Sequence, residues 1–332
     1  MSTSVIPTGI SFSDGTIQTT ATNKKPIRYG LLDTAGLISI VANVSIIGGP
    51  YGIAYCPSNN KMYVCNLDNS TVSVIDPITN AVTTIAVEYG PQGIAYCVST
   101  NKIYVNNASS HTISIIDPTT NTVVNTILPQ LNPIGIAYCP SVDRLYICNY
   151  SSHSISILNP GNNTFSTLSG GSIFGPYGVA YCPSNDRMYI GNNSSTTVTV
   201  IDPVTQTIVA NVTVGTSPNS LTYCPTNDRM YVCNINSSNV SVINPSSNTV
   251  VATIAIGTSP NGIAYCPTNK KIFVSLGGTD LIKIIDPSTN TVITNVSVGA
   301  NPNGIAYCPL TSRMYVANYN GGTMSILTCG VS

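Results

Sequence analysis

The residues of this sequence that could carry chemistry are its cysteines, histidines and carboxylates. The chain has 11 cysteines and two histidines, His111 and His153. A metal site usually needs cysteine or histidine at close, regular spacing such as Cys-x-x-Cys, and no such pair occurs. The two histidines lie in equivalent Ser-Ser-His stretches with no carboxylate beside them, so we interpret them as solvated loop residues. The sequence predicts no metal site and no cofactor.

Catalysis by carboxylates or by an activated nucleophile also has little support in the sequence. Glu88 is the single glutamate, and most aspartates stand in turn sequences, so a paired-carboxylate hydrolase has few candidate residues. No Gly-x-Ser-x-Gly elbow and no phosphate-binding Gly-Lys loop is present. On these grounds we expect that the chain is not an enzyme.

The elements that position these residues form a repeat. The phrase Ala-Tyr-Cys, once as Thr-Tyr-Cys, returns seven times, with cysteines at 56, 97, 139, 182, 224, 266 and 308 and steps of 41 to 43 residues. Each unit contains four short β-type runs separated by turn signals such as Asp-Pro-x-Thr-Asn. A fixed period of about 40–45 residues with four strands per unit is typical of a β-propeller blade.

The two ends of the chain predict how the ring closes. The last unit supplies three strands, and residues 37–47 read as a lone fourth strand that completes that blade. We therefore predict an all-β fold: a seven-bladed β-propeller over residues 31–332, closed by an N-terminal strand, with residues 1–30 as an extended arm. The glycine of each Pro-x-Gly phrase is expected to allow close backbone approach at the innermost strand.

Composition narrows the classes of partner. The chain is 42% hydrophobic, 7% charged and has a formal net charge of zero, so no basic surface is expected to attract nucleic acid. The N-terminus lacks the pattern of a signal peptide, and the most apolar stretch is too short to span a membrane. Without an export signal we expect mostly reduced cysteines.

Two resemblances follow from these motifs. Phrases such as Tyr63-Val64-Cys65-Asn66 and Tyr231-Val232-Cys233-Asn234, with the flanking Val-Ile-Asp-Pro, resemble the YVTN-repeat β-propeller family over roughly residues 37–328. That resemblance implies the fold but not one function. The segment from Gly9 to Ala21 resembles FSDGT-x-Q-T-T-A segments of bacteriophage tail fibres and other virion appendages. It implies attachment through an arm that contains Phe12, Asp14, Gly15 and Gln18.

The repeated cysteines and cations have structural interpretations. In the first hairpin we expect Tyr55 opposite Tyr63 and Cys65 near Ile53, with the position of Cys65 in a tight slot between blades. Only Cys329 is suspected of being reactive. Cations recur at one repeat position, and we expect them to pair across strands with aspartates such as Asp76 rather than to bind an anion. If inner-strand tyrosines such as Tyr181 and Tyr265 are fully buried, their replacement by alanine should cost about 3–5 kcal/mol.

One set of varied residues stands out against this repetition. The x of Pro-x-Gly changes from unit to unit, although folding does not require it to vary, and tyrosine and asparagine contact glycans or polar protein surfaces without charge. The predicted binding residues are Tyr51, Gln92, Ile134, Tyr177, Asn219, Asn261 and Asn303. A surrounding set of asparagines, Asn66 among them, is expected to bond the turn backbone.

Three functions remain open, and the last of them in order is an enzyme that uses the central channel. The first is a non-enzymatic virion protein of a phage tail, baseplate or capsid, tethered to other virion proteins through residues 1–30 and serving host adhesion or particle decoration. Its candidate partners are a host-surface glycan or protein, and the arm could also form an oligomer. The alternative is a bacterial or archaeal YVTN-type protein- or glycan-binding propeller, cytoplasmic or on the cell surface, that is not associated with a virion.

Overall fold

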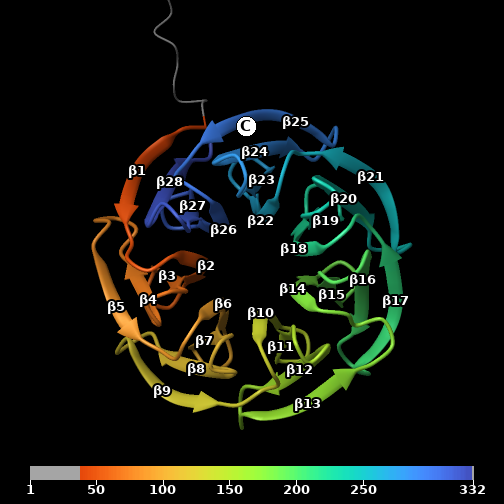
Figure 1. The fold of residues 1–332 in the computed structure, drawn as a ribbon, viewed down its shortest axis with the longest axis horizontal. Helices are drawn as coiled ribbons and strands as arrows, with labels where there is room; N and C mark the ends of the chain where they lie inside the picture. The colour runs from red at the N-terminus through yellow and green to blue at the C-terminus, as the bar shows by residue number, and fades with distance from the viewer. Residues whose placement is uncertain (1–37, 331–332) are drawn as a thin grey trace, which may run out of the picture. The chain divides into compact units, whose positions relative to one another are not determined.

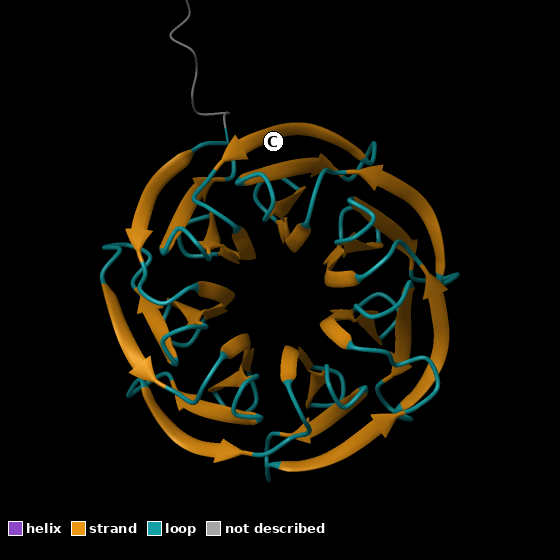
Figure 2. Cartoon of the chain, in the orientation of Figure 1, coloured by secondary structure: helices purple, strands orange, loops and turns teal. Residues whose placement is uncertain are grey.

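The computed structural model describes residues 38–330, which form seven four-stranded antiparallel sheets around a central axis (Figure 1). Figure 2 shows strands and loops only in this part of the chain. None of its elements is therefore a helix with the length and apolar character of a membrane span. The predicted seven-bladed β-propeller is confirmed. The predicted arm, residues 1–30, lies outside the described residues.

The two inner strands of each blade follow the repeat closely. The innermost strands all begin at a proline and end at a cysteine: β2 (Pro50–Cys56), β6 (Pro91–Cys97), β10 (Pro133–Cys139), β14 (Pro176–Cys182), β18 (Pro218–Cys224), β22 (Pro260–Cys266) and β26 (Pro302–Cys308). The second strands all begin at a lysine or arginine: β3 (Lys61–Asn66), β7 (Lys102–Asn107), β11 (Arg144–Asn149), β15 (Arg187–Asn192), β19 (Arg229–Asn234), β23 (Lys271–Leu276) and β27 (Arg313–Asn318).

The two outer strands complete each sheet. The third strands are β4 (Thr71–Ile75), β8 (Thr112–Asp117), β12 (Ser154–Asn159), β16 (Thr197–Asp202), β20 (Asn239–Asn244), β24 (Leu281–Asp286) and β28 (Thr323–Thr328). The outermost strands are β5 (Val82–Ala86), β9 (Thr122–Ile127), β13 (Thr164–Ser169), β17 (Thr207–Thr213), β21 (Thr249–Ala255), β25 (Thr291–Ser297) and, in the last blade, β1 (Ile40–Ser45). Blades 1 to 7 are numbered from the one that begins with β2.

The ring closes as the chain ends predict. Strand β1 pairs antiparallel with β28, so that Asn43 lies opposite Ser325, and Ser325 Oγ donates a hydrogen bond of 2.8 Å to Asn43 Oδ1. The seventh sheet is thus built from both ends of the described chain (Figure 1).

The ring has two unlike faces. One carries the connections from second to third strands and from each blade to the next, and we call it the loop face. The other carries the hairpin turns between first and second and between third and fourth strands, and we call it the turn face. The trailing asparagine of the Asp-Pro-x-Thr-Asn turns has positive φ, 59° at Asn80 and 55° at Asn290, as the sequence predicts.

The predicted register of the first hairpin is wrong by one residue. Tyr55 lies opposite Met62, and Tyr63 lies opposite Ala54. The turn comprises the four residues 57–60, with Asn60 at a φ of 57°, so that Cys56 pairs directly with Lys61. We expected a shorter connection, and one residue more in a turn shifts the pairing by one position.

The same shift changes which aromatic side chains form the core. The fully buried tyrosines lie on the second strands, at Tyr63, Tyr104, Tyr146, Tyr189, Tyr231 and Tyr315. The inner-strand tyrosines, including Tyr181, are only half-buried, so the condition for a cost of about 3–5 kcal/mol at these positions is not met. Between successive blades, the second-strand tyrosines pack with aliphatic side chains in a cluster that repeats around the ring.

Close contacts between innermost strands hold the axis together. A Cβ on Gly135 would lie 2.0 Å from the carbonyl oxygen of Tyr177 in the next blade, and blades 1, 2, 4, 6 and 7 show the same approach. This confirms the predicted role of the Pro-x-Gly glycine. The slot beside it takes a small side chain, since Cys148 is fully buried with its Sγ 3.7 Å from the carbonyl oxygen of Gly178. The predicted packing of this position is confirmed.

Candidate functional site

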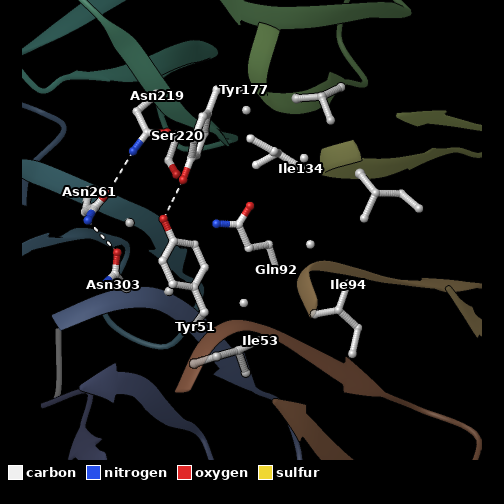
Figure 3. Close-up of a pocket in the computed structure, with 18 of the residues that line it drawn as sticks. Tyr51, Ile53, Gln92, Ile94, Ile134, Tyr177, Asn219, Ser220, Asn261 and Asn303 are labelled. Atoms are coloured by element: carbon white, nitrogen blue, oxygen red, sulfur yellow. Dashed lines mark hydrogen bonds between the residues drawn. The ribbon is translucent and has the colours of Figure 1, made fainter. Parts of the chain in front are cut away.

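The structure brings all seven varied residues together at the mouth of the central channel on the loop face (Figure 3). Each stands next to a β-bulge in its innermost strand, such as the shift between Pro50 and Ile53. A bulge changes the direction of the side chain beside it. The seven varied side chains surround a pocket that continues along the innermost strands past residues such as Ile53, Ile94 and Leu221, and we call this pocket the well. That they bind a ligand stays a prediction.

Tyrosine hydroxyls meet across the well. Tyr51 of blade 1 and Tyr177 of blade 4 are hydrogen-bonded through their hydroxyl oxygens, 2.5 Å apart (Figure 3). Each ring makes an edge-to-face contact with a second tyrosine. The ring centroids of Tyr51 and Tyr319 are 6.2 Å apart, and those of Tyr177 and Tyr150 are 6.3 Å apart. Burial raises the pKa of both Tyr51 and Tyr177, so the hydroxyls stay protonated at neutral pH. Two hydroxyls joined by one hydrogen bond leave a proton that can be donated to a ligand.

Side-chain amides occupy the other side of the well. Asn219 Nδ2 donates to Asn261 Oδ1 at 2.6 Å, and Asn261 Nδ2 donates to Asn303 Oδ1 at 2.5 Å (Figure 3). Asn303 Nδ2 continues to the carbonyl oxygen of Asn301 at 3.3 Å. This one-way chain spans blades 5, 6 and 7 and leaves the Oδ1 of Asn219 at its start without a donor.

Two acceptors at the well therefore lack partners. Asn219 is 1% exposed, and neither its Oδ1 nor the buried Oε1 of Gln92 has a hydrogen-bond partner among residues 38–330. Such groups cost free energy unless something supplies a donor. The asparagines that end the second strands, such as Asn66, also have a buried Oδ1 without a partner. Because this feature recurs from blade to blade, we attribute it to the repeat, and a buried water molecule can donate to each of these oxygens. Gln92 and Asn219 differ because they line the well.

The well is uncharged and of modest size. Below the varied ring, its wall is formed by the glycines and by aliphatic residues such as Ile53, Ile94 and Leu221, and no charged side chain lines it. Its volume is about 190 Å³. An apolar cavity of about 150 Å³ holds benzene, so one six-membered ring fits here.

A second, wider pocket adjoins the well over blades 1 to 4. It measures about 680 Å³ and shares Gln92, Ile134 and Tyr177 with the well. Its wall includes two tyrosines from loops, Tyr89, which is 71% exposed, and Tyr150. Sequence reasoning missed both, although their position in loops rather than strands was a usable signal. Asp68 is the one carboxylate in this wall, and it accepts a hydrogen bond of 3.0 Å from the Tyr319 hydroxyl.

The other singled-out polar residues have structural partners. Asn66 Nδ2 donates to the hydroxyls of Thr71 and Ser73, both at 2.9 Å, so its amide binds the third strand rather than the turn backbone that we expected. Asn192 does bind loop backbone, since its Oδ1 accepts from the Phe174 N–H at 3.4 Å. The histidine rings are exposed, and His153 Nδ1 accepts a 2.8 Å hydrogen bond from the Gly175 N–H of the next blade. His111 does the same for Asn132 at 3.0 Å.

The repeated cations lie on the turn face, and four of the seven pair with aspartates, as the sequence predicts. Lys61 Nζ lies 2.5 Å from Asp76 Oδ2, and the same pair occurs at Lys102–Asp117, Arg187–Asp202 and Lys271–Asp286. Hydrogen bonding to Lys61 is the main cause that lowers the pKa of Asp76 to about 2. Within residues 38–330, no three histidine, cysteine, aspartate or glutamate side chains gather where a metal ion could be held.

The proposed attachment residues Phe12, Asp14, Gly15 and Gln18 lie outside the described residues, so the arm and its partners stay predictions.

Known proteins resemble this chain in fold only. No family model matches it, and no curated protein matches its sequence, so the resemblances to the YVTN family and to phage segments stay predictions. Among solved structures, the Kuenenia stuttgartiensis hydrazine synthase superposes with a TM-score of 0.75 at 20% identity, covering 86% of this chain and 96% of that one. Virginiamycin B lyase from Staphylococcus aureus superposes with a TM-score of 0.76 at 14% identity, covering 88% and 99%. A streptogramin B lyase gives 0.75 at 16% identity, covering 88% and 97%.

These neighbours correct one expectation from the sequence. We expected that the chain is not an enzyme because no familiar catalytic motif is present, yet virginiamycin B lyase and streptogramin B lyase share the same propeller fold. The absence of a motif therefore does not separate this chain from enzymes, and the fold by itself does not establish an activity. The neighbours named here are not virion proteins. The chain is thus a seven-bladed β-propeller similar in fold to hydrazine synthase and streptogramin lyases.

Proposed function

We propose that this protein is a ligand-binding propeller that holds an uncharged, hydroxyl-rich ligand, such as a sugar residue of a glycan, in the loop-face well. The observation that carries the proposal is the pair of buried acceptors without donors, Gln92 Oε1 and Asn219 Oδ1. A hydroxyl group donates and accepts at once, so it can satisfy these oxygens and also accept from the Tyr51–Tyr177 pair.

Charge and shape favour the same class of ligand. No charged side chain lines the well, so an ionic ligand would lose hydration without gaining a counter-ion. The aliphatic ring of Ile53, Ile94 and Leu221 offers an apolar surface to the carbon skeleton of a sugar, while the varied ring above it offers the polar contacts.

The wider pocket extends the proposal from one sugar to an oligosaccharide. It adjoins the well through Gln92, Ile134 and Tyr177, and its volume of about 680 Å³ is in the usual range of small-molecule sites, about 300–1,000 Å³. Tyr89 and Tyr150 supply aromatic faces on which further sugars can lie.

A glycan site in the ring fits either a virion adhesin or a binding propeller that is not associated with a virion. The structural neighbours, hydrazine synthase and the streptogramin lyases, favour the second of these. Whether the protein is cytoplasmic, on the cell surface or on a particle stays a prediction.

A glycan array probed with the full chain tests the proposed function. We expect binding to neutral oligosaccharides, weakened at least about tenfold by Gln92→Leu, which keeps the side-chain bulk but removes the acceptor (about 1.4 kcal/mol). Lys102→Met, on the turn face, is the matched control and should bind as the wild type does. Binding limited to charged glycans, or equal binding by Gln92→Leu, would contradict the proposal. Mass analysis of recovered ligand separates binding from turnover.

A further inference from the structure

The last blade departs from the repeat at one buried position. In the other six blades the third strand is followed by a proline in the turn, and in blade 7 that place is taken by Cys329. An asparagine of the preceding blade donates to the carbonyl oxygen at this position. Asn185 donates to Pro245 at 2.9 Å and Asn227 to Pro287 at 2.8 Å, and Asn269 donates in the same way to Cys329.

This substitution brings two thiols together. Cys266, at the end of β22, and Cys329 belong to one buried cluster and are 0% and 3% exposed. Within that cluster the two thiols influence each other's pKa, and the hydroxyl of Thr268 influences both. The neighbouring thiol of Cys329 is the main cause that lowers the pKa of Cys266, supported by the N–H groups of Asn269 and Thr268. This direction favours the thiolate form of Cys266, which is the nucleophile in thiol–disulfide exchange.

Equivalent cysteines in other blades meet a hydroxyl instead. Cys56 Sγ lies 3.2 Å from Ser58 Oγ, and Cys97 Sγ lies 3.3 Å from Ser99 Oγ. In the other blades, proline holds the position of Cys329, so these cysteines face no second thiol in the next blade. Burial raises the pKa of slot cysteines such as Cys148, which disfavours their thiolate form.

We propose that Cys266 and Cys329 are a modification site that forms a disulfide with a low-molecular-weight disulfide as oxidant, and so ties the end of the last blade to blade 6. The Cys266 thiolate attacks one sulfur of the small disulfide RSSR, forms a mixed disulfide and releases one thiolate. Cys329 then loses its proton, attacks Sγ of Cys266 and displaces the second thiolate. Two cysteine thiols are oxidised by two electrons, one RSSR is reduced, and the two thiol protons end on two RSH.

The position of the bond gives it a consequence for the fold. Cys329 directly follows β28, and β28 pairs with β1 where the two ends of the described chain close the ring. A disulfide from Cys329 to Cys266 would in addition tie the end of β28 to blade 6. It also closes a long chain loop, which restricts the unfolded chain. Thr268, two residues after Cys266, is exposed, so solvent lies close to the buried pair on this side.

The test is oxidation of the full chain with glutathione disulfide, followed by peptide mapping. We expect the protein to lose two of its 11 thiols, to yield one peptide pair linked through residues 266 and 329, and to gain about 5 °C or more in Tm. Cys329→Pro restores the residue of the other repeats and is the matched control. Cys329→Ser serves if the proline variant does not fold. Either variant should show neither a linked peptide nor the gain in Tm, and less glutathione on Cys266 than the wild type forms in transit, because the main cause that lowers the pKa of Cys266 is then gone. A wild-type protein that keeps all its thiols, links another pair or stops at glutathionylated Cys266 would overturn the proposal.

Discussion

The turn face and the loop face of the ring are built from the same repeat but use it differently. On the turn face, contacts recur from blade to blade: Asn59 donates to the carbonyl of Pro118 in the next blade as Asn227 donates to Pro287. On the loop face, the side chain after the first proline of each blade changes from tyrosine to glutamine, isoleucine or asparagine. Repeated positions therefore stabilise the ring, whereas the varied positions at the channel mouth are free to determine what it binds.

The largest effect should come from a repeated core tyrosine. Tyr189 is fully buried, accepts from Asn185 Nδ2 at 3.0 Å and donates to Asn248 Oδ1 of the next blade at 2.9 Å. Tyr189→Ala should lower the free energy of unfolding by about 3–5 kcal/mol, measured by denaturant titration. Tyr181→Ala is the control, since this tyrosine is half-buried, and it should cost clearly less. Equal losses would mean that the two tyrosine positions do not differ as described.

A smaller loss of stability should come from replacing the glycine of Pro-x-Gly, which most blades share at the channel mouth. Gly135→Ala places a Cβ 2.0 Å from the Tyr177 carbonyl, so the innermost strands must move apart, at a cost of about 1–3 kcal/mol. Blade 5 has Ser220 at the same place, and its backbone already accommodates a side chain. Ser220→Ala should therefore change the unfolding free energy by less than about 0.5 kcal/mol. An unchanged unfolding free energy in Gly135→Ala would show that the close approach of the innermost strands does not contribute to stability.

The smallest effect should come from the turn-face ion pairs. Hydrogen bonds from Lys271 and Ser288 lower the pKa of Asp286 to about 2, against about 3.9 in the unfolded chain. Because the folded pKa is the lower one, this stabilisation is complete above about pH 4 and is lost as the pH falls towards 2. Lys271→Met should flatten the fall in Tm between pH 4 and 2. Arg144→Met, whose equivalent partner position holds the non-titrating Asn159, should leave the profile unchanged. An unchanged profile in Lys271→Met would contradict this account.

The sequence predicts most of the fold because the repeat carries it. The positions of the seven cysteines, the Pro-x-Gly glycines and residues 37–47 were enough to predict the blade number, the close approach of the innermost strands and the closure of the ring. The hairpin register failed because it depends on turn length, and serine and asparagine in the turn do not fix that length.

The candidate site was predictable in its members but not in its contacts. Variation after each Pro identifies the seven side chains that line the well. The bond between Tyr51 and Tyr177 joins residues 126 positions apart in blades 1 and 4. It depends on the diameter of the ring and on the bulge that aims each side chain. The thiol contact between Cys266 and Cys329 depends likewise on how one blade packs against the next, although the replacement of proline by Cys329 was visible in the repeat.

The most direct test of the loop-face proposal is a crystal structure of the protein soaked with its best-binding neutral oligosaccharide. We predict a sugar ring in the well with hydroxyl groups within hydrogen-bond distance of Gln92 Oε1 and Asn219 Oδ1, and further sugars over Tyr89 and Tyr150. An oligosaccharide bound on the turn face or on the outer strands, with only water in the well, would contradict the proposed site.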